Sequence, residues 1–176
     1  VTRNGLHSFL VLNYENGYEK ENDITNSIVN KGFSHLRFTK NLLNNIFVEF
    51  FVQYGFNDFL LMKERLLYGS GFRYRFFDSE KMNTHIGIGL MQEDEIYDLE
   101  NNQDMSLIRS TNYITWKIKL SNNAQLGNTA YFQFDTKRSK DNRMLYDGDL
   151  SIALNEKLSF NFMTLSYTHL TMTTTH

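Results

Sequence analysis

The sequence predicts an all-β fold, an antiparallel up-and-down transmembrane β-barrel of which about nine strands are visible. Three observations predict it. Apolar and polar residues alternate with a period of two over long segments, which places apolar side chains on one face of a strand. Proline, which cannot donate to a strand ladder, is absent from all 176 residues. Short, turn-like connections alternate with longer polar ones, as they do in outer-membrane barrels.

The segment IFVEFFVQYGF, residues 46–56, has the clearest alternation. Its even positions are all apolar or aromatic, whereas its odd positions include Glu49 and Gln53. A helix would scatter the even positions around its circumference, because successive ones rotate by about 200°. Phe, Val and Tyr also favour strands. The segment therefore predicts a strand with one apolar face and one mixed face.

Further segments repeat this two-faced pattern. Residues 60–77 place Arg65 and Arg73 on the mixed face, residues 84–98 place Glu93 and Glu95 there, and 109–120 and 126–135 alternate in the same way. We expect four further strands, with weaker patterns, at about 6–15, 27–40, 143–154 and 158–170.

The connections predict the topology. The short ones are 41–45, 78–82, 121–124 and 155–157, and the longer polar ones are 16–26, 99–105 and 137–143. Residues 57–59 are short where a long connection is expected. Short turns are periplasmic in outer-membrane barrels, so we expect the N terminus on the periplasmic side. An odd strand count would leave an open edge in lipid. We therefore expect 1–176 to be a single β-barrel domain that lacks at least one C-terminal strand and possibly N-terminal strands, with about 10–12 strands when complete.

Composition excludes several classes of function. The net charge is −2 with both signs interspersed, so no nucleic-acid partner is predicted. The absence of cysteine excludes disulfides, thiolate metal sites and cysteine nucleophiles. The mean hydropathy of −0.45 does not exclude a membrane protein, because a transmembrane barrel hides its apolar band in every second residue.

Four stretches together resemble a known family. FSHLRF (33–38), VEFFVQYGFNDF (48–59), ERLLYGSGFRYRF (64–76) and GIGLMQEDE (87–95) are similar, in order and spacing, to the outer-membrane β-barrel family known as domain of unknown function 481. The resemblance covers roughly residues 5–170. It implies a barrel in the outer membrane of a Gram-negative bacterial cell, with further strands at both ends. The family has no established enzymatic activity.

The mixed face is interpreted as a barrel lumen with a charge network. We expect Arg37 opposite Glu49 and Arg109 opposite Glu95. The predicted lumenal residues are Arg37, Glu49, Gln53, Arg65, Arg73, Glu93, Glu95 and Arg109. These charges either plug a narrow interior and set the register, or line a selective aqueous path. Two same-face acids about 6.5–7 Å apart on one strand also permit a glycosidase or metal site, but a neighbouring arginine favours salt bridging. No catalytic residue, metal site or cofactor is predicted.

The apolar face is interpreted as a lipid-facing surface with an aromatic girdle. The predicted lipid-facing aromatic residues are Tyr54, Tyr68, Tyr74, Phe76, Trp116 and Phe160. The expected partners are the lipid bilayer, lipopolysaccharide and other outer-membrane proteins in a larger complex. The function expected from this is a structural or accessory role in an outer-membrane assembly, without enzymatic activity. The alternatives are a small channel or ligand-binding barrel in the outer membrane, and a soluble lipocalin-like barrel whose apolar faces pack inward.

Overall fold

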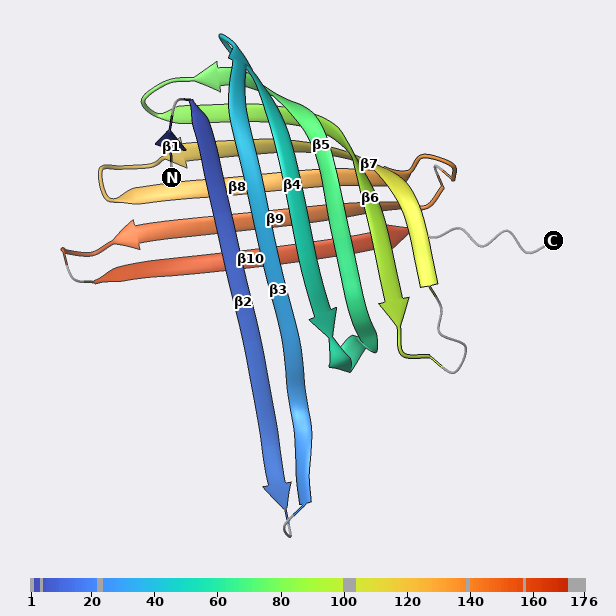
Figure 1. The fold of residues 1–176 in the computed structure, drawn as a ribbon. Coiled ribbons are helices and arrows are strands. Elements are labelled where there is room, and N and C mark those ends of the chain that lie inside the picture. The colour runs from blue at the N-terminus through green and yellow to red at the C-terminus, as the bar shows by residue number, and fades with distance from the viewer. Residues whose placement is uncertain are drawn as a thin grey trace. The chain divides into compact units, whose positions relative to one another are not determined.

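The computed structural model describes residues 2–3, 5–21, 24–99, 104–138, 140–156 and 158–170. These contain ten strands and one short 3-10 helix (Figure 1). The elements are β1 (Thr2–Arg3), β2 (Leu6–Glu21), β3 (Ile24–Leu43), β4 (Ile46–Asn57), η1 (Asp58–Leu60), β5 (Met62–Asp78), β6 (Met82–Tyr97), β7 (Asp104–Lys119), β8 (Ala124–Asp135), β9 (Asn142–Ala153) and β10 (Ser159–Leu170).

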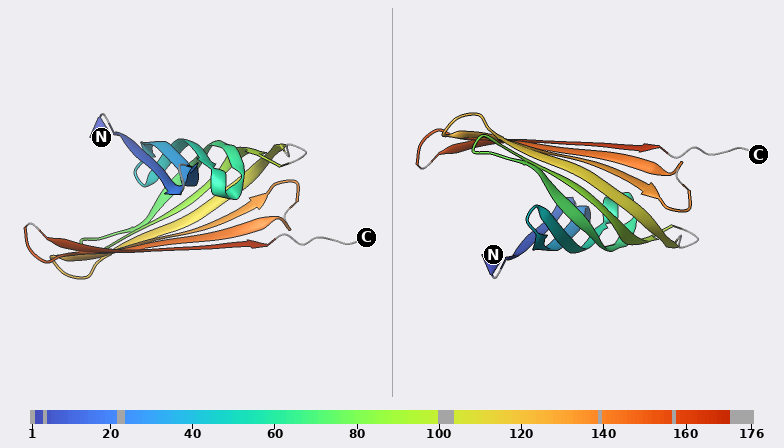
Figure 2. Two further views of the ribbon diagram at one scale, coloured as in Figure 1. Left: turned by 90° about the horizontal axis from the view of Figure 1, so that it is seen from below. Right: turned by 90° about the horizontal axis from the view of Figure 1, so that it is seen from above.

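The strands form one sheet in sequence order, from β1 to β10. Consecutive strands lie side by side in the three ribbon views (Figures 1 and 2). Pairing is antiparallel, for example from Leu6↔Lys40 to Glu21↔Ile24 between β2 and β3. The predicted all-β, antiparallel, up-and-down arrangement is therefore confirmed, and the nine predicted strands correspond to β2 through β10.

One predicted connection is wrong. Residues 16–26 were expected to form a polar loop, but β2 continues to Glu21 and β3 begins at Ile24. Pairs such as Lys20↔Thr25 continue the ladder through this region. A ladder is made by backbone N–H and C=O groups, so a polar sequence does not stop it. The sequence pattern also missed the short strand β1 and the helix η1.

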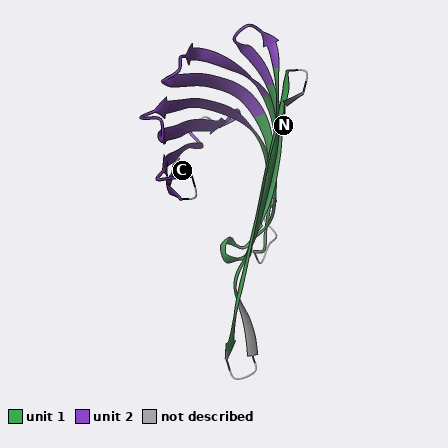
Figure 3. Cartoon of the chain, turned by 90° about the vertical axis from the view of Figure 1, so that its left-hand side faces the viewer, with its two compact units in different colours: residues 1–40, 49–70, 91–108 green, residues 41–48, 71–90, 109–176 purple. Residues whose placement is uncertain are grey.

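The chain divides into two compact units, drawn in different colours in Figure 3. Unit 1 comprises residues 1–40, 49–70 and 91–108, and unit 2 comprises residues 41–48, 71–90 and 109–176. Each unit takes parts of several strands.

The two faces of the central strands differ in burial. In β4, Phe47 and Glu49 are buried, whereas Phe50, Val52 and Tyr54, on the opposite face, are exposed. In the part of the chain that the structure describes, buried polar or charged side chains outnumber buried apolar ones, eleven to four. The four are Phe47, Leu67, Met91 and Leu107. The arrangement is the reverse of an ordinary soluble core, in which large apolar side chains are the buried class.

Candidate functional site: a buried ion-pair cluster on the polar face

An ion-pair cluster joins β5 and β6 in unit 1. The Nη2 atom of Arg65 donates a 2.6 Å hydrogen bond to Oε1 of Glu93. Its Nε atom lies 2.8 Å from Oε1 of Glu95, outside hydrogen-bond geometry, so that contact is electrostatic. The hydroxyl of Tyr97 donates a 2.9 Å hydrogen bond to Oε2 of Glu95. One guanidinium thus holds two carboxylates.

Strand periodicity explains why these groups meet. Glu93, Glu95 and Tyr97 occupy alternate positions of β6, so they share one face. Arg65 lies on β5, the neighbouring strand, where cross-strand side chains come within reach. The Glu93 side chain is 0% exposed and that of Arg65 is 27% exposed. A buried carboxylate is stable only if it is paired, and Arg65 supplies a counter-charge for Glu93.

Glu49 and Gln53 lie on the same mixed face of β4. Glu49 is buried and accepts a 3.3 Å hydrogen bond from the hydroxyl of Thr39 on β3, the strand that also carries half-buried Arg37. Half-buried Gln53 has its Oε1 atom 3.3 Å from Nδ1 of His35. The polar groups within the apolar run of β4 therefore face β3 partners and not the exposed side of the sheet.

Unit 2 contains a second buried pair. Arg109 of β7, 2% exposed, contacts both carboxylate oxygens of Asp141, with Nη1–Oδ1 at 3.0 Å and Nη2–Oδ2 at 3.4 Å. Its register partner on β8 is Asp135. Arg73, also predicted for the network, is half-buried in β5. Thus the predicted residues Arg65, Glu93 and Glu95 come together, while Arg109 also pairs with Asp141, a residue outside the predicted set.

A smaller cluster in unit 2 includes an aromatic ring. The guanidinium of Arg75 lies over the Phe47 ring, 5.1 Å from its centroid. His85 meets the same ring edge-on, with centroids 6.3 Å apart. Phe47 and His85 are both buried. The arginine therefore loses water on one side and gains a cation–π contact in exchange.

The aromatic residues predicted to face lipid lie mostly on the exposed face. Tyr54, Tyr68, Tyr74, Phe76 and Phe160 are all exposed. Trp116 is half-buried, and its ring lies 6.4 Å from that of Tyr146. This face also carries exposed aliphatic side chains such as Ile88 and Leu90.

The carboxylates of the cluster have arginine and tyrosine partners. Over the described residues, no group of three or more His, Cys, Asp or Glu side chains is placed to hold a metal ion. The sequence pattern missed Thr39, His35, Tyr97 and Asp141. Tyr97 could have been found, since it continues the alternation of Glu93 and Glu95.

Among the residues that the structure describes, no helix is long and apolar enough to cross a membrane. No curated protein and no solved structure matches the chain. Residues 5–169 match the family described as "Protein of unknown function, DUF481", which includes all four stretches that carried the resemblance. The chain therefore belongs to the DUF481 family.

Proposed function

We propose that this protein is an outer-membrane β-barrel whose apolar face contacts lipid and whose charged face forms a plugged interior, and that it is a structural or accessory component of an outer-membrane assembly. One observation carries the proposal, namely the inverted polarity of the sheet. Buried side chains such as Glu93 and Arg109 are charged. On the opposite face, exposed side chains such as Ile96 and Ile108 are apolar.

Water is a poor solvent for such a surface. Monomeric soluble proteins rarely expose contiguous apolar patches larger than a few hundred Å², yet exposed apolar side chains alternate over residues 50–54 of β4, 72–76 of β5 and 86–90 of β6. Outer-membrane barrels place an alternating apolar face of this kind against lipid. Strand length agrees, because β2 through β10 have 12 to 20 residues each and a tilted transmembrane strand needs about 9–11.

The paired charges support a plug more than an ion path. A conducting pore needs groups that an ion can approach and leave. Arg65 is instead ion-paired with Glu93 and Glu95, and Arg109 with Asp141, and each of these side chains is 27% exposed or less. Such pairs fill space, fix the register of neighbouring strands and leave fewer charged groups for a passing ion to bind.

Fractionation followed by mild-detergent purification tests the proposal. We expect the protein to sediment with outer membranes, to stay there after washing with high salt or carbonate, and to co-purify with outer-membrane proteins in fixed ratio. Reconstitution in planar bilayers should give no conductance. Recovery in the soluble fraction without detergent would contradict the membrane role and favour the lipocalin-like alternative.

Arg73→Ala separates the plug from the channel. With a plugged interior, the variant should lose folding yield or stability without creating a conductance. A folded variant with altered ion selectivity, together with conductance in the parent protein, would instead identify a channel. A lone protein with no stoichiometric partner would contradict the accessory role while leaving the membrane location intact.

A further inference from the structure

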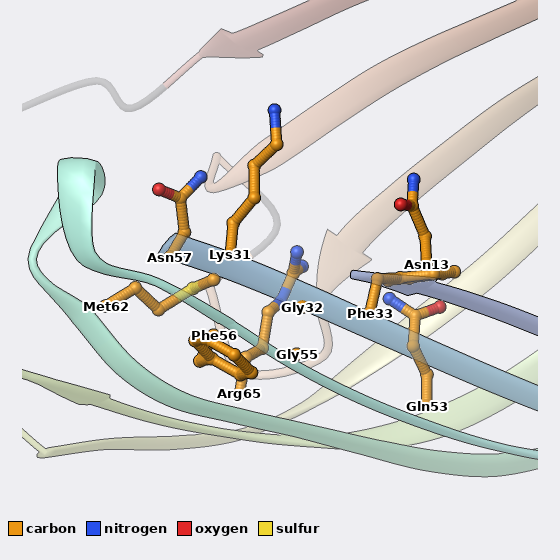
Figure 4. A pocket seen from close by; sticks show the side chains of 10 residues that line it. All are labelled: Asn13, Lys31, Gly32, Phe33, Gln53, Gly55, Phe56, Asn57, Met62 and Arg65. Atoms are coloured by element: carbon orange, nitrogen blue, oxygen red, sulfur yellow. The ribbon is translucent and has the colours of Figure 1, made fainter. Parts of the chain in front are cut away.

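A hollow of about 200 Å³ lies on the polar face of unit 1, beside the ion-pair cluster (Figure 4). Its depth comes from Gly55, a buried residue of β4 that carries no side chain. Phe33 on β3 and Arg65 on β5 line its sides. A Cβ atom added at Gly55 would lie 3.3 Å from the backbone oxygen of Gly32, so even alanine would crowd the floor.

Amide side chains surround the hollow. Oε1 of Gln53 lies within hydrogen-bond distance of Nδ1 of His35. The Nε2 amino group of Gln53 can therefore donate to another acceptor. Oδ1 of Asn57 accepts the backbone N–H groups of Phe59 and Leu60, which leaves its Nδ2 group. Asn13, on β2, lies at the rim. In Figure 4 the polar ends of these side chains lie on one side of the strands, together with those of Lys31 and Arg65. The lining of the hollow therefore includes several side chains that carry N–H donors.

The charges at the hollow are already compensated. Lys31 forms a 2.8 Å ion pair with Glu15, and Arg65 forms ion pairs with Glu93 and Glu95. An anionic ligand would have to compete with these existing ion pairs for Lys31 and Arg65. A neutral ligand with many oxygen atoms meets no such penalty.

An aromatic ring supplies the apolar part of the site. Phe33 lines the hollow and is held by His35, with the two rings parallel at an interplanar angle of 2° and centroids 6.4 Å apart. The negative face of an aromatic ring attracts weakly positive C–H groups. A sugar ring has hydroxyls around its edge and C–H groups on its face. Amide donors can bind the hydroxyls, and an aromatic face can contact the C–H groups.

We propose that this hollow binds a single neutral hexose unit, as a free monosaccharide or as one residue of a glycan. Its volume is below the roughly 300–1,000 Å³ of pockets for drug-sized ligands, which limits the occupant to about one ring. Phe33 stacks against the ring, and Asn13, Gln53 and Asn57 contact its hydroxyl oxygens. Binding of this kind does not require the membrane role, so the two proposals fail independently.

Saturation-transfer difference NMR on the purified full chain tests this, with D-glucose, D-galactose and D-mannose as probes and D-glucuronate and D-glucose 6-phosphate as charged comparisons. We expect saturable transfer from at least one neutral hexose and weaker transfer from its charged counterparts. Phe33→Leu and Asn13→Leu should each weaken binding by about tenfold, which corresponds to the loss of one or two such contacts. Gln133→Leu on β8 is the matched control, because this half-buried glutamine does not line the hollow.

Gly55→Leu, which would fill the floor, should abolish binding, and a circular-dichroism spectrum identical to that of the parent would show that the sheet persists. The proposal is overturned if no neutral hexose gives a saturable signal, if the charged sugars bind more tightly, or if Phe33→Leu and Asn13→Leu bind as the parent does. Because Phe33 and Asn13 are exposed, their substitution leaves the fold intact and keeps the test valid should Gly55→Leu fail to fold.

Discussion

The Nη2 atom of Arg65 lies 2.6 Å from Oε1 of Glu93, a side chain with no exposed surface. The contact places a full negative charge inside the protein and supplies its counter-charge from the neighbouring strand. Removing one member of a buried ion pair destabilises a protein more than replacing both members with apolar residues, because the other charge stays buried without its counter-charge. This asymmetry makes the pair a sensitive probe of the polar face.

Arg65→Met should lower the free energy of unfolding by about 3–5 kcal/mol, the usual cost of an uncompensated buried charge. Urea titration of the refolded protein in lipid vesicles, followed by Trp116 fluorescence, would measure it. Lys63→Met is the control, because Lys63 and Asp98 form a 2.7 Å pair at 51% and 61% exposure, where such pairs contribute about 1 kcal/mol or less. Adding Glu93→Gln to Arg65→Met should recover part of the loss. Equal effects of the two single substitutions would show that Glu93 is not buried in the folded protein.

Arginine on the exposed apolar face should destabilise the protein according to depth in the bilayer. Ile88 in the middle of β6 and Leu120 at the β7–β8 turn are similarly exposed, at 59% and 57%. Ile88→Arg should cost about 2–4 kcal/mol and Leu120→Arg about 0–1 kcal/mol, as charges do at the midplane and at the interface. The same unfolding titration in vesicles compares them. Small and equal costs would mean that water, and not lipid, surrounds Ile88.

Gly87 makes room for an aromatic ring. In unit 2 the Tyr113 ring on β7 covers Gly87 of β6 so closely that a Cβ atom there would overlap the ring. Gly87→Ala should therefore cost about 1–3 kcal/mol through overpacking. In a Tyr113→Ala background the same change should cost much less, with a coupling energy of about 0.5–3 kcal/mol.

The control for that cycle is Gly17→Ala on β2. A Cβ atom there would meet Val29 at an ordinary 3.7 Å, so the substitution should be close to neutral. Additive effects of Gly87→Ala and Tyr113→Ala in urea titrations would show that the ring does not rest on the glycine.

The strands and their two faces were predictable from the sequence because both depend on a local period of two. Glu49, Glu93 and Arg109 all lie where this period places them, on the buried side. The period carries no information on where a hairpin ends, which is why β2 and β3 continue through residues expected to form a loop. Backbone pairing tolerated the polar side chains in that region.

The partners of the charged residues were less predictable than their faces. Arg109 meets Asp141, which lies beyond β8 and just before β9. That contact depends on where β8 ends and on how the following connection turns back, and neither is encoded by alternation. Arg65 could be placed near Glu93 and Glu95 because its strand and theirs are consecutive and joined by a short turn.

Nitroxide accessibility along β6 tests the central claim most directly, that the apolar face contacts lipid. The chain has no native cysteine, so single variants such as Ile86→Cys, Ile88→Cys and Leu90→Cys carry one label each, with His85→Cys and Met91→Cys as buried comparisons. In vesicles, labels at the three exposed positions should be relaxed strongly by oxygen, which concentrates in the bilayer, and weakly by a water-soluble nickel complex. Labels at the buried positions should be reached poorly by oxygen. Free access of the nickel complex to positions 86, 88 and 90 would contradict the membrane account and assign this face to water.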